Sequence, residues 1–353
     1  MAFMLLTGFL GAYIALCVWA HQCVLRTGQL AKRTQQFTDA SGCARSVEYK
    51  TICGDWGTAM VVREIFKDMV YTRHGIDIPV TGSPLVIDVG CNIGLFSMFV
   101  LEVNPHAVVV AAEPIPWLCA LAKENTARYG QQVWVEQVGI SAASLSDAEF
   151  LVDPRVMAGA SMYETEITRA WKDAALCRQL SVVGRDNVTA GNLPAQPTLL
   201  LCSLLEMPVL QWLVTLLLMP ALVLFVIFLL LSPSKRRHVR CDCVPFAELL
   251  ERSTLHMPDV AMRRRITDGP IALVKVDVEG AEWDVLLGIA DSEWRRIEQI
   301  VIEVHDVQNR VRRVEQLLRA KGFQEVHIAQ EEWVSHNVLR IHSVFARRTK
   351  TEG

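Results

Sequence analysis

A glycine-rich turn in the first half of the chain has the residue types and spacing of a ligand site. It follows an apolar run and reads Asp88-x-Gly90-x-Asn92-x-Gly94. Glycines at this spacing let a ligand approach backbone N–H groups, and an acid two residues before Gly90 can hold a ligand donor. Nicotinamide sites instead read Gly-x-Gly-x-x-Gly, and Asn92 takes the place of a glycine in the related pattern. The turn therefore predicts a nucleotide-like ligand and disfavours a nicotinamide oxidoreductase.

A single acid supports the ligand interpretation of this turn. Glu113 ends the apolar run 107–112, about twenty residues after the turn, where an acid can accept both hydroxyls of a ribose. The alternative is that the glycines form a tight turn and nothing more. Glu113 argues against that alternative because it places a second ligand-binding group at the end of the next predicted strand.

Two clusters of polar residues later in the chain could carry the chemistry. They follow the apolar runs 271–276 and 299–304 and consist of Lys275, Asp277, Glu279 and Glu282, and of Glu303, His305 and Asp306. In open α/β sheets ligands bind outside the carboxyl ends of the strands, so both clusters are expected to face the same crevice as the glycine turn. Ordinary helix capping is the alternative, and it is strongest for Glu282 and Asp306.

The elements that position these residues alternate between strand and helix. The predicted strands are 85–89, 107–112, 133–138, 271–276 and 299–304, with a closing pair at 323–328 and 338–346. The predicted helices are 96–103, 116–128, 246–252, 282–289 and 307–318, and a helix at 58–71 is expected to be scaffold only. This alternation predicts a parallel sheet with helices on both faces. Each half of the chain holds only part of that sheet.

The first residues form an uncharged apolar segment. Residues 2–20 are just long enough to span a bilayer as a helix. Arg26, Lys32 and Arg33 follow them, and the positive-inside tendency would leave the rest of the chain in the cytosol. A cleaved signal peptide is the alternative, although no basic residue precedes the segment. Residues 1–33 are therefore expected to be a membrane anchor or signal with a basic flank.

A second apolar segment raises a topological conflict. Residues 207–234 carry no charge and resemble a membrane helix. One spanning helix there would put the two halves of the sheet on opposite sides of the membrane. Three solutions stay open: a re-entrant hairpin, a hydrophobic flap on the domain or membrane surface, or a retained intron that is not part of the functional protein.

The chain thus divides into five regions. They are the anchor or signal at 1–33, a linker and leading helix at 34–84, the first half of the domain at 85–150, an insert at 151–237, and the second half at 238–348. Within the second region, residues 34–50 are polar and are expected to be linker.

Composition limits the classes of function. A net charge of −3 argues against a nucleic-acid binder held by bulk charge. The mean hydropathy of +0.26 is high for a wholly soluble protein, and the excess lies in the two apolar segments. The ten cysteines include no Cys-x-x-Cys pair, so reduced or buried thiols are expected rather than a zinc site.

Several of these motifs resemble the FkbM family of S-adenosylmethionine-dependent methyltransferases. The similarity rests on Val86-Ile-Asp-Val-Gly-Cys-Asn-Ile-Gly, Glu113-Pro, Val274-Lys-Val-Asp-Val-Glu-Gly-Ala-Glu and Ile302-Glu-Val-His. It covers residues 85–149 and 239–345. The resemblance implies an α/β class I methyltransferase fold, a Rossmann-like sheet of seven mostly parallel strands with an antiparallel last strand, here interrupted by the apolar insert. It also implies S-adenosyl-L-methionine as cofactor and transfer to an oxygen acceptor.

The resemblance also implies roles for individual residues. Asp88, Gly90, Asn92 and Gly94 would hold the methionine end of the cofactor, and Glu113 its ribose. Asp277, Glu279 and His305 are the candidates for acceptor orientation and general base. A divalent metal held by these three residues is chemically possible, but the expected site contains no metal.

The expected function is O-methylation of a hydroxyl on a small-molecule, sugar or lipid-like acceptor at a membrane, with the catalytic domain in the cytosol. Neither nucleic acid nor a nicotinamide cofactor is expected. The alternative is a catalytically silent methyltransferase-like protein that is tethered to the membrane and binds a ligand. The intact acids Asp88, Glu113 and Asp277 favour the enzyme.

Overall fold

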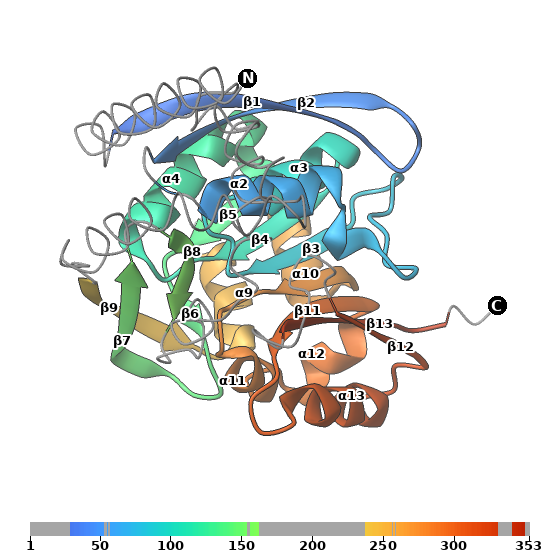
Figure 1. Ribbon diagram of the computed structural model, residues 1–353. Helices are drawn as coiled ribbons and strands as arrows, with labels where there is room; N and C mark the ends of the chain where they lie inside the picture. Colours follow the sequence, from blue (N-terminus) through green and yellow to red (C-terminus); the bar gives the residue numbers. More distant parts are fainter. Residues whose placement is uncertain are drawn as a thin grey trace, which may run out of the picture.

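A seven-stranded sheet runs through the centre of the molecule (Figure 1). The computed structural model describes residues 29–52, 55, 57–153, 156–161, 237–255, 257, 259–330 and 341–349. The strands of the central sheet are β3 (Leu85–Val89), β4 (Val108–Ala112), β5 (Val133–Glu136), β10 (Ile271–Val276), β11 (Gln299–His305), β12 (Glu325–Gln330) and β13 (Ile341–Arg347). The predicted strands are thereby confirmed to within a few residues.

The order of the strands is β12-β13-β11-β10-β3-β4-β5. Neighbours from β11 to β5 are parallel, whereas β13, the last strand of the chain, is antiparallel to both β11 and β12. This is the predicted class I sheet. The two halves of the chain meet at its centre, where Lys275 on β10 lies opposite Asp88 on β3. The expectation that both halves build one sheet is confirmed.

Alternate residues of the central strands face two separate apolar cores. Val86, Leu273 and Val301 belong to one core, and their neighbours Ile87 and Val274 belong to the other. Strands β3, β4 and β10 are buried along their whole length, as strands covered on both faces must be. This explains why their sequences are apolar apart from Asp88 and Lys275, which pair with each other.

Helices from different parts of the chain cover the two faces of the sheet (Figure 1). One face carries α2 (Gly57–Val62), the π-helical turn η1 (Arg63–Lys67), α3 (Leu95–Val103) and α4 (Pro116–Thr126). The other carries α9 (Phe246–Thr254), α10 (Val260–Asp268), α11 (Glu282–Leu287), α12 (Asp291–Arg296) and α13 (Arg310–Ala320). Two short 3₁₀ segments complete the helices, η2 (Val70–Thr72) and η3 (Ala127–Gln132). The predicted leading helix at 58–71 corresponds to α2, η1 and η2 together.

The expectation of a linker at 34–50 is wrong, because these residues form an antiparallel hairpin. Its strands are β1 (Leu30–Thr38) and β2 (Ala44–Ile52). Every second residue of β2 from Val47 to Thr51 is buried, and β2 packs against α3 and α4. The ring centre of Phe37 lies 5.1 Å from that of Phe66 and 5.3 Å from that of Phe99. The hairpin is therefore an outer layer of the domain.

The ends of the apolar insert lie on neighbouring strands of a second sheet. This sheet has the order β6-β9-β7-β8 and contains β6 (Gly139–Ile140), β7 (Leu145–Asp153), β8 (Val156–Ser161) and β9 (Arg237–Val244). Val152 on β7 pairs with Arg237 on β9, so the chain returns beside the point from which it departed.

The two apolar segments of the sequence, 2–20 and 207–234, lie outside the described residues. None of the helices in the described part of the chain combines the length and the apolar character needed to cross a bilayer.

Candidate functional site

The glycine turn after β3 is held tightly against the end of β10. Gly90 has φ of +79°, and a Cβ atom there would lie 1.8 Å from the carbonyl oxygen of Asp277. The backbone N–H of Asp277 donates to the carbonyl of Val89 over 3.1 Å. A glycine is required because the chain itself approaches so closely. Gly94, with φ of +85°, then begins α3.

Glu113 is joined to the turn by hydrogen bonds. Its Oε2 accepts from the backbone N–H of Asn92 over 2.9 Å, and its Oε1 accepts from Ile115 over 3.0 Å. Asn92 has φ of +51°, and its Oδ1 accepts from the N–H of Ile93. Only 5% of Glu113 is exposed, and burial raises its pKa to about 7 although both backbone donors favour the ionised form. The sequence-predicted turn and acid are brought together.

A buried ion pair ties the turn to the second half of the chain. The Nζ of Lys275 lies 3.3 Å from Oδ1 of Asp88 and donates to the carbonyl of Gly90 over 2.7 Å. Oδ2 of Asp88 accepts from the hydroxyl of Ser97 over 2.7 Å. Burial opposes the charge on Lys275, but Asp88 and Asp277 outweigh it and hold the pKa of Lys275 above its ordinary value. Lys275 therefore stays charged and locks the two strand ends together.

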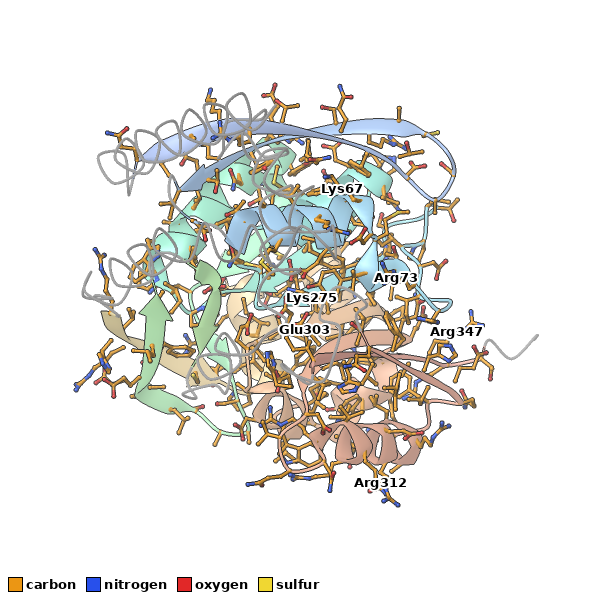
Figure 2. The ribbon with its side chains drawn as sticks, viewed as in Figure 1. Lys67, Arg73, Lys275, Glu303, Arg312 and Arg347 are labelled. Atoms are coloured by element: carbon orange, nitrogen blue, oxygen red, sulfur yellow. The ribbon has the colours of Figure 1, made fainter. Side chains whose placement is uncertain are left out.

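Three carboxylates converge beside this ion pair. One oxygen each from Asp277, Glu279 and Glu303 lies within 4.8 Å of the others. Lys275 and Glu303 lie near the centre of the molecule in Figure 2, at the carboxyl ends of β10 and β11. Burial raises the pKa of Glu279, and burial with the repulsion of neighbouring acids, chiefly Asp277, raises that of Glu303 well above its usual range. The cluster can hold protons at neutral pH.

His305 is buried, whereas the three acids of the carboxylate cluster are partly exposed. Its Nδ1 is 2.7 Å from Oε1 of Glu282, and its Nε2 is 3.3 Å from Oε2 of Glu279. Burial opposes the imidazolium, but its contacts with these two carboxylates hold the pKa of His305 well above its ordinary value. Arg310 forms the second ion pair of Glu282. His305 therefore stays protonated and orients Glu279, which does not suit a general base.

The capping interpretation is supported for two acids of these clusters. Oδ1 of Asp306 accepts from the N–H of Val311 in the first turn of α13. Glu282 is fully buried and accepts from the N–H of Gly280, in addition to its contacts with His305 and Arg310. Both acids hold their own loops in place, and neither is among the carboxylates that converge.

Sequence reasoning missed two members of the site. Tyr71, on the segment expected to be scaffold, donates its hydroxyl to Oδ2 of Asp277 over 2.9 Å. Glu303 was placed in a polar cluster but was given no role, while the structure puts it among the convergent carboxylates. Alternation provides a signal for Glu303, because it lies two residues after Val301 and so shares the face of the first core.

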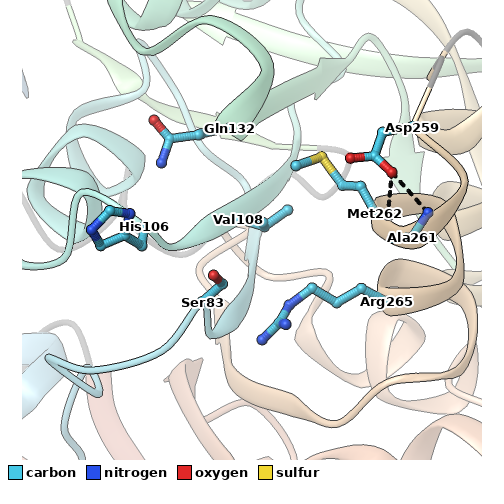
Figure 3. A pocket seen from close by; sticks show the side chains of 8 residues that line it. All are labelled: Ser83, His106, Val108, Gln132, Asp259, Ala261, Met262 and Arg265. Carbon is cyan, nitrogen blue, oxygen red and sulfur yellow. Dashed lines mark hydrogen bonds between the residues drawn. The ribbon is translucent and has the colours of Figure 1, made fainter.

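A separate cavity of about 340 Å³ lies at the opposite, amino ends of the strands. Figure 3 shows the side chains that line it. It is lined by Ser83, His106, Val108, Gln132, Asp259, Ala261, Met262 and Arg265. Ser83, Val108 and Gln132 stand just before or at the amino ends of β3, β4 and β5. None of the predicted site residues lines this cavity.

Comparison with known proteins identifies the family. A profile described as "Methyltransferase FkbM domain" matches residues 245–325. The 31-O-demethyl-FK506 methyltransferase FkbM of Streptomyces tacrolimicus is 30% identical over 288 residues, which are 81% of this chain and 88% of that protein. The chain belongs to the FkbM methyltransferase family. The AMB antimetabolite synthetase AmbE of Pseudomonas aeruginosa is 31% identical over 78% of this chain, which corresponds to 11% of its own length.

One of the similar solved structures is also a protein named methyltransferase FkbM. The methyltransferase FkbM from Methylobacillus flagellatus KT has 12% sequence identity to this chain and a TM-score of 0.40, covering 78% of this chain and 46% of that one.

The acidic side chains and the glycine turn fit S-adenosylmethionine, the cofactor of the FkbM family. The direction of the strand order changes between β3 and β10, and ligands of open α/β sheets bind at such a switch point. Asp88, Glu113 and the glycine turn lie beside this point, and Oδ1 of Asp88 is buried without a hydrogen bond. The amino group and ribose of the cofactor carry hydrogen-bond donors, which suit acidic partners. The residue-level roles of the turn stay predictions.

The same carboxylate cluster has the ligand chemistry of a hard cation. Asp277, Glu279 and Glu303 provide oxygen atoms at compatible spacing. The set differs from the one considered from the sequence, because Glu303 takes the place of His305. Both ring nitrogens of His305 face carboxylates instead.

Proposed function

We propose that this chain transfers a methyl group from S-adenosylmethionine to a hydroxyl of a small-molecule, sugar or lipid-like acceptor. The observation that carries the proposal is the convergence of Asp277, Glu279 and Glu303 beside the cofactor turn. The cofactor supplies a methyl group that its sulfonium already activates. The protein then needs to orient an oxygen nucleophile and accept its proton.

The carboxylates have the properties that these two tasks require. Asp277 follows β10 directly, and the turn of Gly90 lies against its backbone, so its side chain is the nearest of the three to the cofactor turn. A carboxylate there accepts the hydrogen bond of an acceptor hydroxyl and takes its proton as the new C–O bond forms. Glu303, whose pKa is raised well above its usual range, can donate a hydrogen bond to another oxygen of the acceptor.

Electrostatics favours neutral or cationic acceptors. Asp88, Asp277 and Glu279 crowd around the site, and Lys275 is already engaged by two of them. A phosphate or carboxylate on the acceptor would meet like charges, so neutral hydroxylated molecules suit the site better. The Streptomyces relative is named as the methyltransferase of an O-demethylated compound, which supports an oxygen acceptor.

The test is an acceptor screen with the full chain and S-adenosylmethionine labelled with ¹³C in its methyl group. The proposal predicts a labelled O-methyl product, identified by mass spectrometry and by its ¹³C–¹H resonance. A labelled N-methyl or C-methyl product would overturn the oxygen acceptor. The alternative, a silent binding protein, predicts cofactor binding without labelled product from any acceptor in the screen.

The membrane location is also a proposal. It is supported by the apolar sequences at 2–20 and 207–234 and by the basic residues that follow each of them. We propose that the chain is held at a membrane with its catalytic domain in the cytosol. Fractionation of cells and protease protection test this location. Recovery of the whole chain in the high-speed supernatant, without detergent, would contradict it.

A further inference from the structure

Tyr71 reaches the candidate site from the N-terminal layer of the domain. It lies on η2, and its hydroxyl donates to Asp277 Oδ2, 206 positions later in the chain, over 2.9 Å. Its ring packs edge-on against Phe96 at 5.4 Å, and the Nζ of Lys275 lies 5.4 Å from the ring centre. Only 4% of Tyr71 is exposed. The hydroxyl is therefore directed by packing on several sides.

The contacts of Asp277 are unequal between its two oxygens. Tyr71 donates to Oδ2, and Lys275 lies 3.4 Å from the same atom. Among the described residues, no hydrogen bond reaches Oδ1, and 22% of the Asp277 side chain is exposed. One oxygen is thus fixed by the protein, and the other is left for a ligand by the described residues.

We propose that Tyr71 is a positioning residue for methyl transfer. It fixes the rotation of the Asp277 carboxylate so that Oδ1 is presented to the acceptor hydroxyl, and it does so without touching the acceptor. The inference rests on the proposed function. Burial, together with the charge of Asp277, raises the pKa of Tyr71 above its ordinary value, so the phenol keeps its proton and acts as a donor.

The local backbone supports this assignment. Met69, which precedes η2, has φ of +46° and ψ of +45°, a conformation that side chains with a Cβ rarely adopt. The turn is fixed by the N–H of Thr72, which donates to the carbonyl of Met69, and by Nε of Arg73, which donates to the carbonyl of Asp68. Strain that the surroundings hold in place is typical of functional segments.

The test compares Tyr71→Phe with Tyr49→Phe. Both changes remove one hydroxyl from a buried tyrosine, but Tyr49 lies on β2, away from the carboxylate cluster. We expect Tyr71→Phe to lower kcat by about 10- to 100-fold, the range for losing a group that orients a reacting side chain. Its affinity for S-adenosylmethionine should change by less than about twofold, because no contact with the turn is lost. Tyr49→Phe should keep the wild-type kcat.

A double-mutant comparison separates positioning from mere stability. In an Asp277→Asn background, adding Tyr71→Phe should cause no further loss of kcat, because Tyr71 acts only through the Asp277 carboxylate. A lower melting temperature with unchanged kcat, or an equal loss of kcat in the Asp277→Asn background, would show a purely structural role and overturn the inference.

Two further outcomes are decisive. If Tyr71→Phe does not fold, Tyr71→Met is measured in its place, because Met fills irregular space and also lacks the hydroxyl. Turnover at the wild-type level in that variant would overturn the inference while the proposed function stands. If the wild-type chain transfers no methyl group to any acceptor, the proposed function fails, and the inference fails with it.

Discussion

At the scale of single residues, the site depends on acids whose protonation the surroundings control. Glu113 is buried between two backbone donors, and its pKa is about 7. His305 and Lys275 stay protonated because carboxylates surround them. Asp277 contacts Lys275 and Tyr71, and 22% of its side chain is exposed. The chemistry is therefore expected to depend on pH within the neutral range.

Binding of S-adenosylmethionine should release a proton from Glu113. The ribose hydroxyls favour the ionised carboxylate, which is the minor form below pH 7 in the free protein. The affinity should therefore rise with pH. Below pH 7 it should fall with a slope that approaches about tenfold per pH unit. Titration calorimetry from pH 6 to 8 in buffers of different ionisation enthalpy measures both effects. Glu113→Gln should bind more weakly at pH 8 and show no such dependence; an equal pH dependence in this variant would assign the proton to another group.

At the scale of elements, the glycine turn and the end of β10 form one unit. The approach of Gly90 to the Asp277 carbonyl leaves no room for a side chain. Lys275 joins both pieces through Asp88 and the Gly90 carbonyl. The turn is thus a structural contact between the two halves of the chain as well as a ligand site.

Gly90→Ala should destabilise the protein by about 3 kcal/mol or more, because the new Cβ forces the turn away from β10 and breaks a buried network. Gly42→Ala is the matched control. Gly42 also has positive φ, +83°, but nothing lies within 4 Å of its Cβ position. Its substitution should cost only about 1 to 2 kcal/mol. Urea unfolding of both variants checks the difference, and equal costs would show that the close approach is unimportant.

The elements also show what sequence patterns can and cannot predict. The buried strands were predicted well, because β3 and β10 are apolar except for Asp88 and Lys275. The hairpin β1–β2 was mistaken for linker because its exposed residues are polar and only alternate positions such as Val47 are buried. The turn and Glu113 were identified by their spacing. Tyr71 could not be, since its partner is 206 residues away and its own segment reads as an ordinary amphipathic helix.

At the scale of the whole molecule, the two halves of the sheet meet although a long insert separates them. Leu151 on β7 pairs with Ser161 on one side and with His238 on the other. Ser161 and His238 are therefore about two strand spacings apart, roughly 10 Å. In the described part of the chain, the central sheet has seven strands, and all of them lie outside residues 162–236.

Replacing residues 162–236 with a flexible linker of about eight Gly and Ser residues should therefore preserve the fold and the affinity for S-adenosylmethionine. Circular dichroism and calorimetry measure both properties against the full chain. Loss of cofactor binding in a variant that keeps its secondary structure would contradict this independence.

The central claim is that one set of acids binds the cofactor while Asp277 serves the transfer step. The most direct measurement determines cofactor affinity and label transfer in parallel for the wild type, Asp277→Asn and Glu113→Gln. The account predicts that Asp277→Asn binds S-adenosylmethionine within about threefold of the wild type but loses about 100-fold or more in kcat. In Glu113→Gln the main loss should be in the affinity for S-adenosylmethionine. Full turnover in Asp277→Asn would contradict the account.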